Sequence, residues 1–385
     1  MIFDTNIAGH HIEYIHHLCE GMRVYHNDEM IIVLPSAFKT QKKIYKWNTD
    51  NCVFVYYSEE RLKEFHGFGS VSLFVNSWRR TKVLKECIDT YNPDSVFLNA
   101  IVDYMPILPF IIHKRTCISG IIYKIYLYKW KKVSFPQKIS HILNNCLYSY
   151  SNSIANVFVL NDKSAAIYLN KRYHTNKYKY LPDPFNDISY KGKNIREKLL
   201  INKRAKVYLH FGAMSERKGT LDILDAISAL DDSDIVNRVF IFAGVVNPQI
   251  RSMFYRKAEL LRNKCGILVF DSFCDNIFLH DLCVTSDYLL CPYKETDLSS
   301  GVIGYAAKYL KPVIGPQSGL IGKLIRKNRL GITIEDNSVS SLCRAIVDIT
   351  KYNFNINPMY IKTIEIAEFN NIVVGALKKK TPEFL

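Results

Sequence analysis

The chain has 385 residues, which at roughly 100–200 residues per domain predicts two domains. Hydrophobic residues make up 48% of it and charged residues 23%, values that exclude a disordered, collagen-like or coiled-coil chain. The longest apolar stretch, Tyr104 to Ile112, is about half as long as the roughly 20 residues of a membrane-spanning helix, and two prolines interrupt it. The N-terminus has no basic region, long apolar core and cleavage site of a secretory signal, so we expect a cytoplasmic protein.

The net charge of +15 is distributed unevenly. Between Tyr104 and Pro182 there are 12 Lys and Arg residues against the single acid Asp162, whereas the rest of the chain carries 39 basic and 35 acidic residues. A stretch of one sign predicts a polyanionic partner, namely phospholipid headgroups, a lipid-linked diphosphate or nucleic acid. Nucleic acid is the weakest of the three, because no recognised binding motif accompanies the charge. The ten cysteines occur singly, which predicts reduced thiols and neither a zinc site nor disulfides.

Short β-rich runs alternate with longer segments of helical period, a pattern typical of α/β domains with parallel sheets. In chain order we expect strands at residues 1–5, 30–34, 53–57, 95–99, 157–160, 207–212, 239–244, 266–271, 288–292, 312–315 and 331–334. Between them we expect helices at residues 9–22, 164–172, 220–229, 250–263, 277–285, 302–310 and 339–350. Several of the strands are bare apolar runs, as expected for strands buried on both faces of a sheet.

The sequence Leu181-Pro182-Asp183-Pro184-Phe185 is the most rigid and turn-prone segment in the middle of the chain, so we expect a domain boundary there. It separates one Rossmann-like domain, residues 1–183, from a second, residues 184–360. A helical segment at 361–385 would follow and pack back on the first domain. Ligands of open α/β sheets bind beyond the carboxyl ends of the strands, so we expect two such domains facing each other across a cleft.

The segment from Val207 to Thr220 is a strand followed by a polar turn and a helix. The turn begins at Gly212 and places backbone N–H groups and the positive end of a helix dipole where a phosphate can bind. Arg217 and Lys218 add positive charge beside it. The alternative is a solvent-exposed basic turn that only begins a helix.

A second loop follows the strand at 288–292. It presents two carboxylates, Glu295 and Asp297, and then Ser299, Ser300 and Gly301 begin a helix without side-chain bulk. Carboxylates accept hydrogen bonds from sugar hydroxyls, and a helix N-terminus offers N–H donors to a phosphate, so one loop could hold both halves of a sugar nucleotide. The alternative is a simple N-cap by one of the two serines.

Together these blocks resemble the donor half of GT-B glycosyltransferases of the family-four type. The likeness rests on the turn at 211–219, the loop at 295–302 and the run from Tyr309 to Gly315, and it covers nearly the whole second half of the chain. In the first half, Gly9-His10-His11 resembles the glycine turn that these enzymes place under the donor. The resemblance implies a retaining hexosyltransferase of cell-surface polysaccharide synthesis. It implies a nucleotide-sugar donor, with a UDP-sugar favoured, on the C-terminal domain and a glycan or lipid-linked saccharide acceptor on the N-terminal domain.

By this resemblance Lys218 neutralises the donor diphosphate, with help from Arg217, and the amides of Gly301 and Val302 hold its distal phosphate. Chemistry in such enzymes depends on stabilising the leaving group with fixed cations and N–H dipoles. Because these groups neutralise the diphosphate, no metal or other cofactor is expected.

Family members carry two glutamates eight residues apart, the first contacting the donor hexose and the second the ribose. Asp297 and Tyr305 stand at these two positions, and Glu295 competes with Asp297 for the sugar contact. Tyr305 offers one hydroxyl where a carboxylate could hold two ribose hydroxyls. Ala213 stands where many members have an arginine. Divergence of the donor site is favoured over its decay, because the glycine and basic positions are kept. The alternative function is a non-catalytic module that binds a sugar nucleotide or a glycan on the same scaffold.

Histidines are the other candidates in the first half. His10 and His11 lie at the glycine turn, and His11 is the candidate catalytic residue of the two. His16 and His17 follow at helical spacing, so all four could instead be polar positions on one amphipathic helix.

The basic stretch contains a run from residue 121 to 132 in which aromatic residues alternate with Lys124, Lys129, Lys131 and Lys132. Lysines are attracted to an anionic leaflet, and Tyr and Trp favour the headgroup level. The run therefore predicts a contact with the inner face of the membrane or with a lipid diphosphate. The alternative is an ordinary amphipathic helix with solvated lysines.

Overall fold

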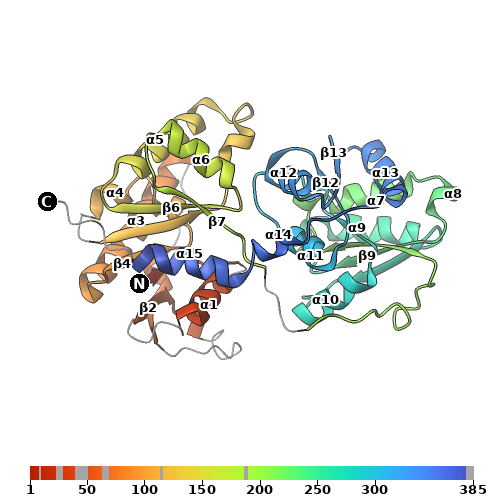
Figure 1. The fold of residues 1–385 in the computed structure, drawn as a ribbon, viewed down its shortest axis with the longest axis horizontal. Coiled ribbons are helices and arrows are strands. Elements are labelled where there is room, and N and C mark those ends of the chain that lie inside the picture. Colours follow the sequence, from red (N-terminus) through yellow and green to blue (C-terminus); the bar gives the residue numbers. More distant parts are fainter. Residues whose placement is uncertain are drawn as a thin grey trace. The chain divides into compact units, whose positions relative to one another are not determined.

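The computed structural model describes residues 1–7, 10–22, 29–39, 51–62, 69–112, 116–185 and 190–378. The chain divides into two compact units, each shown in Figure 1. Unit 1 comprises Met1–Pro184 together with Ile366–Leu385, and unit 2 comprises Phe185–Glu365. The boundary after Pro184 lies one residue from the one expected after Asp183, and unit 2 extends a few residues past the expected limit of 360. Helix α15 (Ile366–Lys378) belongs to unit 1, where it packs on α1 (His10–Met22).

Unit 1 is built on a sheet of seven parallel strands in the described part of the chain, in the order β3-β2-β1-β4-β5-β6-β7. Strand β1 lies between β2 and β4, with Ile2 opposite both Ile32 and Phe97. The chain order reverses direction at β1 and β4, which makes their carboxyl ends the topological switch point where open α/β sheets bind ligands. The strands are β1 (Ile2–Phe3), β2 (Met30–Pro35), β3 (Cys52–Tyr57), β4 (Ser95–Leu98), β5 (Cys117–Ile122), β6 (Ile154–Leu160) and β7 (Tyr178–Leu181).

Two layers of helices cover this sheet. Helices α1 and α15 pack on one face, where Leu18 and Phe369 join Phe158 in a single core. Figure 1 shows α5 and α6 on the opposite side of the sheet. The helices α5 and α6 span Phe135–Tyr150 and Lys163–Arg172. The other helical segments that connect the strands of unit 1 are η1 (Glu59–Leu62), α3 (Gly69–Tyr91), η2 (Ile101–Tyr104), α4 (Leu108–Ile111) and η3 (Tyr126–Lys129).

Unit 2 repeats the same strand order. Its six parallel strands follow the order β10-β9-β8-β11-β12-β13, and Leu209 of the central β8 lies opposite Ile241 on one side and Leu289 on the other. The switch point of this sheet therefore lies between β8 and β11. The strands are β8 (Lys206–Phe211), β9 (Arg238–Ala243), β10 (Gly266–Phe270), β11 (Tyr288–Leu290), β12 (Val313–Pro316) and β13 (Gly331–Ile334).

The helices of unit 2 form its core with the sheet. Helices α7, α9 and α13 enclose Tyr208, Phe240 and Phe242, which are fully buried. Helix α11 contacts α10 and α12. The helical segments are η4 (Glu216–Lys218), α7 (Thr220–Ser228), α8 (Asp232–Ile235), α9 (Pro248–Leu261), α10 (Asn276–Thr285), α11 (Gly301–Tyr309), α12 (Gly319–Asn328), α13 (Val339–Asp348), η5 (Ile349–Lys351) and α14 (Met359–Lys362).

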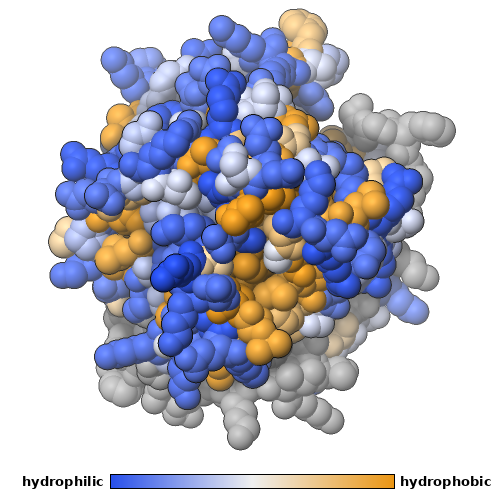
Figure 2. All heavy atoms as spheres, turned by 90° about the vertical axis from the view of Figure 1, so that its right-hand side faces the viewer, coloured by the Kyte–Doolittle hydropathy of each residue, from blue (hydrophilic) through white to orange (hydrophobic). Residues whose placement is uncertain are grey.

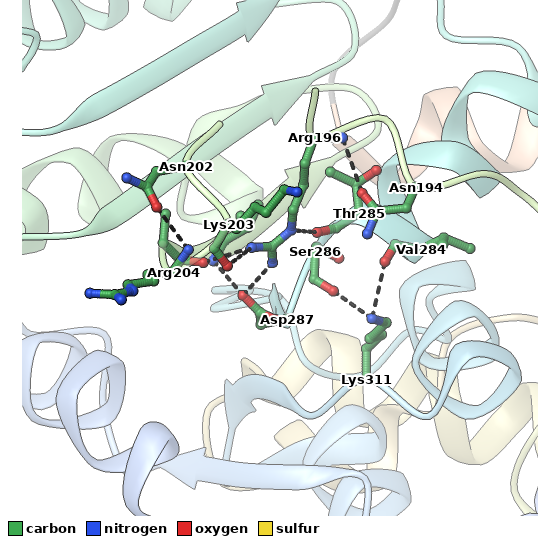
Figure 3. Close-up of polar contacts among 12 residues, drawn as sticks. Asn194, Arg196, Asn202, Lys203, Arg204, Val284, Thr285, Ser286, Asp287 and Lys311 are labelled. Carbon is green, nitrogen blue, oxygen red and sulfur yellow. Dashed lines mark hydrogen bonds and ion pairs between the residues drawn. The ribbon is translucent and has the colours of Figure 1, made fainter. Parts of the chain in front are cut away.

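A cluster around Arg196 holds the segment that leads into unit 2 against the amino ends of β8 and β11 (Figure 3). Its guanidinium donates to the carboxylate of Asp287 at 2.8 Å and to the backbone oxygens of Thr285 at 3.2 Å and Ala205 at 2.9 Å. The same Asp287 carboxylate accepts from the amide of Val207 at 2.8 Å. Because these contacts lie at the amino ends of the strands, away from the switch point, the cluster is a structural one.

Figure 2 shows one face of unit 2, on which hydrophobic side chains gather in a patch among hydrophilic ones. Exposed apolar side chains of this unit include Leu200, Val236 and Leu260. Exposed apolar residues are normal on a folded protein, where apolar atoms supply more than half of the surface. No described helix is both long enough and apolar enough to span a bilayer.

The strands expected from the sequence all occur, most of them shifted by one to three residues at an end. Two further strands, β5 and β7, and the helices α3, α5 and α12 were not expected. The alternative that residues 121–132 form an amphipathic helix is wrong, because β5 extends to Ile122 and is followed by the short turn η3. The four N-terminal histidines do lie on one helix, α1, as that alternative has it, but it is wrong for His17, whose side chain is buried.

Candidate functional site

The switch point of unit 2 brings together the two loops that the sequence singles out. The turn after β8 leads through η4 into α7, and the loop after β11 leads into α11. The two loops are joined directly, because the amide of Lys294 donates to the carbonyl of Arg217 at 2.9 Å. A side chain at Gly219, which has a φ of +72°, would clash with the carbonyl of Pro292, so the loops need glycine to approach this closely.

Gly212 and Lys218 form the centre of this switch-point site. Gly212 has a φ of +91°, and a Cβ added there would lie 2.6 Å from Lys218 Nζ, so the ammonium group lies directly over the glycine. Burial lowers the pKa of Lys218 to about 8; the nearby Cys291 thiol acts in the opposite direction, and the Arg217 guanidinium lowers it further. A half-buried cation without a carboxylate among these neighbours favours a bound anion.

A buried histidine fixes the turn. His210 is 1% exposed, with Nδ1 3.0 Å from the carbonyl oxygen of Leu290 and Nε2 3.0 Å from Thr220 Oγ1. Burial lowers the pKa of His210 to about 4, so the ring is neutral, donating from Nδ1 and accepting at Nε2. Thr220 Oγ1 also accepts from the amide of Ser215 at 3.1 Å. This chain of hydrogen bonds ties β8, the turn and β11 together. Its one sign in the sequence is a histidine within a strand.

Tyr293 connects Lys218 to the start of α11. Its ring is 4% exposed, and Lys218 Nζ lies 5.4 Å from the ring centroid. Ser300 Oγ donates to the Tyr293 hydroxyl at 3.4 Å and accepts from the amide of Val302 at 3.4 Å, so Ser300 is the N-cap of α11. The space in front of this N-terminus is open, because a Cβ at Gly301 would meet nothing within 4 Å. The capping role and a phosphate contact are therefore compatible at the same helix end.

The two candidate carboxylates lie in the loop between β11 and α11. Asp297 is 4% exposed, and Glu295 is half-buried. The loop is held from α12, since the amide of Leu320 donates to the carbonyl of Thr296 at 2.6 Å. Which of the two carboxylates contacts a sugar stays a prediction.

Tyr305, at the position expected for a ribose contact, belongs to an aromatic cluster. Its ring meets Phe185, Phe211 and His280 edge to face, with centroids 4.9, 5.2 and 5.3 Å away. Its neighbour Gly304 lies under Phe185, whose ring a Cβ there would meet at 2.6 Å. The side chain is therefore held in place by packing.

The switch point of unit 1 carries an aspartate–histidine pair. Asp4 follows β1 directly, and its Oδ2 accepts from His11 Nδ1 at 2.8 Å and from Asn99 Nδ2 at 2.8 Å. Asn99, which follows the neighbouring strand β4, also donates to the backbone oxygen of His11 at 2.9 Å. With Nδ1 donating to the carboxylate, Nε2 of His11 can accept a hydrogen bond or a proton from a substrate hydroxyl. Gly9, expected to form part of this turn, lies outside the described residues.

Aromatic residues complete this edge. Tyr123, which follows β5, stacks on the His11 ring at 5.6 Å, and the Tyr14 hydroxyl donates to Asp183 at 2.6 Å. His10 is exposed and pairs with the Glu13 carboxylate at 3.3 Å. The carboxyl ends of β1, β4, β5 and β7 thus present a polar and aromatic surface with His11 in it.

The described residues include no group of three or more His, Cys, Asp or Glu side chains placed to hold a metal ion. The Asp-x-Asp sequence Asp232-Ser233-Asp234 lies in α8, between α7 and the amino end of β9.

Comparison with known proteins bears on the fold. The chain is similar to WaaG, a glycosyltransferase involved in lipopolysaccharide biosynthesis, with a TM-score of 0.64 and 14% identity over 99% of this chain and 100% of that one. The fold is that of the GT-B glycosyltransferases. The GT-B chain is also similar to Anabaena HepE in complex with UDP-glucose, with a TM-score of 0.64 and 14% identity over 98% of both chains. A trehalose-phosphate synthase (UDP-forming) from Burkholderia xenovorans gives a TM-score of 0.69 and 8% identity over 98% of this chain and 99% of that one. No family model and no curated protein matches the sequence.

Proposed function

We propose that this GT-B protein is a glycosyltransferase that moves a hexose from a nucleotide sugar, with a UDP-sugar favoured, to a glycan or lipid-linked saccharide. The observation that carries the proposal is the half-buried Lys218 ammonium over Gly212 at the switch point of unit 2, in the loop cluster that also contains the open N-terminus of α11. A half-buried cation, small residues and a helix N-terminus together suit a diphosphate. HepE, which has the same fold, binds UDP-glucose.

The chemistry requires stabilisation of the departing diphosphate. Each preorganised donor to a developing negative charge is typically worth about 2.7–4 kcal/mol of barrier, so Lys218 and the α11 amides can supply most of the effect without a metal. Asp297 or Glu295 would hold sugar hydroxyls, with unit 1 holding the acceptor near His11. Retention of configuration and a role in cell-surface polysaccharide synthesis follow from the resemblance to family-four enzymes and are part of the proposal.

Nucleotide binding tests the donor site first. Thermal unfolding is measured with UDP, GDP, ADP and CMP on the wild type, on Lys218→Ala and on Lys206→Ala. Lys206 is an exposed lysine at the amino end of β8, the strand whose carboxyl end leads into the turn of Lys218. A ligand at 100 times its dissociation constant raises the free energy of unfolding of the protein by about 2.7 kcal/mol. At roughly 2–4 °C per kcal/mol, the unfolding midpoint then rises by several degrees. We expect a shift with UDP that Lys218→Ala loses and Lys206→Ala keeps. No shift with any nucleotide would refute the donor site.

Turnover separates an enzyme from the alternative, a non-catalytic module on the same scaffold. An enzyme releases UDP from a UDP-sugar when a suitable acceptor is present, and Asp297→Asn slows that release while UDP still binds. A module binds the nucleotide or glycan and releases no UDP above the uncatalysed rate with any acceptor fraction. That result would favour the module.

We also propose that the protein is cytoplasmic and associates peripherally with the inner face of the membrane. Helix α5 presents a row of exposed apolar side chains, with Phe135 75%, Ile139 51% and Leu143 48% exposed. Lys131 and Lys132 are exposed just before it, so apolar area and positive charge occur together, the combination that binds an anionic leaflet.

Vesicle binding tests this association. We expect sedimentation with phosphatidylglycerol vesicles, weaker sedimentation with phosphatidylcholine vesicles, and loss of both in Ile139→Glu combined with Leu143→Glu. Leu260→Glu, at a leucine of unit 2 that is 70% exposed, is the control. Equal sedimentation of the double variant and the wild type would refute the α5 contact.

A further inference from the structure

The helical layer of unit 1 contains a cavity that neither switch point uses. It lies between η3, α5 and α6 and has a volume of about 340 Å³. A cavity of this size is at the lower end of the range for small-molecule sites, roughly 300–1,000 Å³. Four of its seven lining residues are aromatic, and one is a cation: Tyr126, Leu127, Trp130, Ile142, Tyr168, Arg172 and Tyr173.

The base of this aromatic pocket is polar. The hydroxyl of Tyr126 accepts from Asn145 Nδ2 at 3.1 Å, and Asn145 Oδ1 accepts from the Tyr178 hydroxyl at 2.7 Å. Asn145 is 4% exposed, so this network is buried behind the pocket. A hydroxyl held in this way can still offer hydrogen bonds to a ligand, which a purely hydrocarbon pocket could not do.

The walls are held in place independently of any ligand. The ring of Tyr126 stacks on His141 with centroids 4.5 Å apart and planes 7° apart. The turn η3 is anchored by the buried Ile125 and by a hydrogen bond from the Tyr128 hydroxyl to Asp162, the N-cap of α6. Preorganised aromatic surfaces lose little entropy when a ligand binds to them.

The rim is positive. Lys138 Nζ lies 5.5 Å from the Trp130 ring centroid, and the Arg172 guanidinium lies 5.9 Å from that of Tyr173. The single acid between Tyr104 and Pro182, Asp162, is buried and engaged in capping α6. Of the charged side chains between Tyr104 and Pro182, an anionic group at the mouth of the pocket would therefore meet only cationic ones.

We propose that this pocket binds an anionic saccharide, a pyranose unit that carries a carboxylate or phosphate. The C–H face of a pyranose packs on aromatic rings, its hydroxyls suit the Tyr126 hydroxyl, and its charge suits Arg172. A flat bilayer cannot enter a concave site. The site lies in the helical layer, so it does not depend on the reaction proposed above.

Calorimetric titration without donor tests the proposal. The probes are tri-galacturonate, as an anionic pyranose trisaccharide, and maltotriose, as a neutral one. We expect tri-galacturonate to bind more tightly than maltotriose and its affinity to fall with added salt. Trp130→Ala should weaken tri-galacturonate binding at least tenfold, the effect expected from losing one stacked aromatic face. Arg172→Gln should remove most of the preference for the anionic sugar.

Matched variants control for unfolding and for non-specific effects. Trp78→Ala removes an exposed tryptophan of α3 that has Lys82 Nζ over its ring at the same 5.5 Å, and it should bind the sugar like the wild type. Trp130→Phe keeps a stacking ring and should bind within a few-fold of the wild type even if Trp130→Ala fails to fold. No binding of either sugar to the wild type, equal binding of both, or unchanged tri-galacturonate binding by both Trp130→Ala and Arg172→Gln would overturn the proposal. Loss of binding in Trp78→Ala as large as that in Trp130→Ala would overturn it as well. Loss of vesicle binding but not of sugar binding in the Trp130 and Arg172 variants would also overturn the proposal, because it would assign the pocket to lipid. Because the assay omits nucleotide, its failure leaves UDP binding at Lys218 unaffected.

Discussion

The affinity of the protein for UDP should fall as the pH rises from 7 to 9, because the lysine that meets the diphosphate loses its proton in this range. Burial lowers the pKa of Lys218 to about 8 in the absence of ligand. A bound diphosphate favours the charged ammonium and so raises this pKa, which means that binding above pH 7 takes up a proton. The terminal phosphate of a nucleotide ionises near pH 6, at about the second pKa of a phosphate ester, so the ligand's own charge changes little in the window.

The size of the effect follows from the protonated fraction. With a pKa of about 8, roughly nine tenths of Lys218 is protonated at pH 7 and about one tenth at pH 9, so affinity should fall about tenfold, or about 1.4 kcal/mol. The neighbouring groups do not titrate in this range. Burial raises the pKa of Cys291 to about 12 and lowers that of His210 to about 4, and Arg217 stays charged.

Calorimetry at pH 8 in two buffers of different ionisation enthalpy measures how many protons the complex takes up when UDP binds. We expect about half a proton per UDP bound. Lys218→Arg keeps the charge but does not titrate, so its affinity should be flat between pH 7 and 9 and its proton uptake near zero. Wild-type affinity that is flat over this range, or release of protons on binding, would refute the assignment of Lys218 to the diphosphate.

The same shift makes a prediction for stability without ligand. A lysine with a pKa of 10.5 when unfolded and about 8 when folded binds its proton less well in the folded state. Its burial therefore costs about 3 kcal/mol below pH 8, and the cost is relieved as the pH rises toward 10.5. Lys218→Met should remove this cost, so the unliganded variant should be more stable than the wild type at pH 7, as measured by urea unfolding.

Three further substitutions test other parts of the structure. Gly212→Ala should weaken UDP binding at least tenfold, since it strains a φ of +91° and puts a Cβ 2.6 Å from the lysine ammonium, and calorimetry checks this. Asp4→Asn should lower kcat about a hundredfold through the orientation of His11 and leave UDP affinity within a factor of two, as steady-state kinetics and titration would show. Arg196→Met should destabilise unit 2 by about 2 kcal/mol in urea unfolding, because it leaves a half-buried carboxylate without its cation.

Strands buried on both faces are visible in the sequence as apolar runs, and this made most of the two sheets predictable. The two missed strands lack that signal. Strand β5 contains Ser119 and Gly120, and a Cβ at Gly120 would lie 2.7 Å from the side chain of Ile101, so the glycine is required by a contact with η2 that only the fold creates. Strand β7 is at the sheet's edge and alternates Tyr and Lys, a pattern set by one exposed side.

The functional residues were predictable to the extent that they are close in sequence. Gly212 and Lys218 share one turn, so their approach follows from a strand, a turn and a helix. The pairing of Asp4 with Asn99, 95 residues apart, depends on β1 lying beside β4, which no local pattern reveals. Tyr293 likewise meets Lys218 because β8 lies beside β11. In both units the missed partners come from the strand across the switch point.

Tyr305 stands where the family that the donor half resembles has its second glutamate, and its packing favours divergence of the site over decay. The Tyr305 ring packs against Phe185, Phe211 and His280, all edge to face at about the same distance, which is not expected of a residue under no constraint. Tyr305→Phe should keep this packing and lose about 1 kcal/mol of UDP binding if the hydroxyl contacts the ribose. Tyr305→Glu should destabilise unit 2 by about 1–3 kcal/mol without improving UDP affinity, because a carboxylate would lie half-buried among rings. If Tyr305→Glu instead binds UDP more tightly at unchanged stability, the aromatic cluster is incidental, and decay becomes the better explanation.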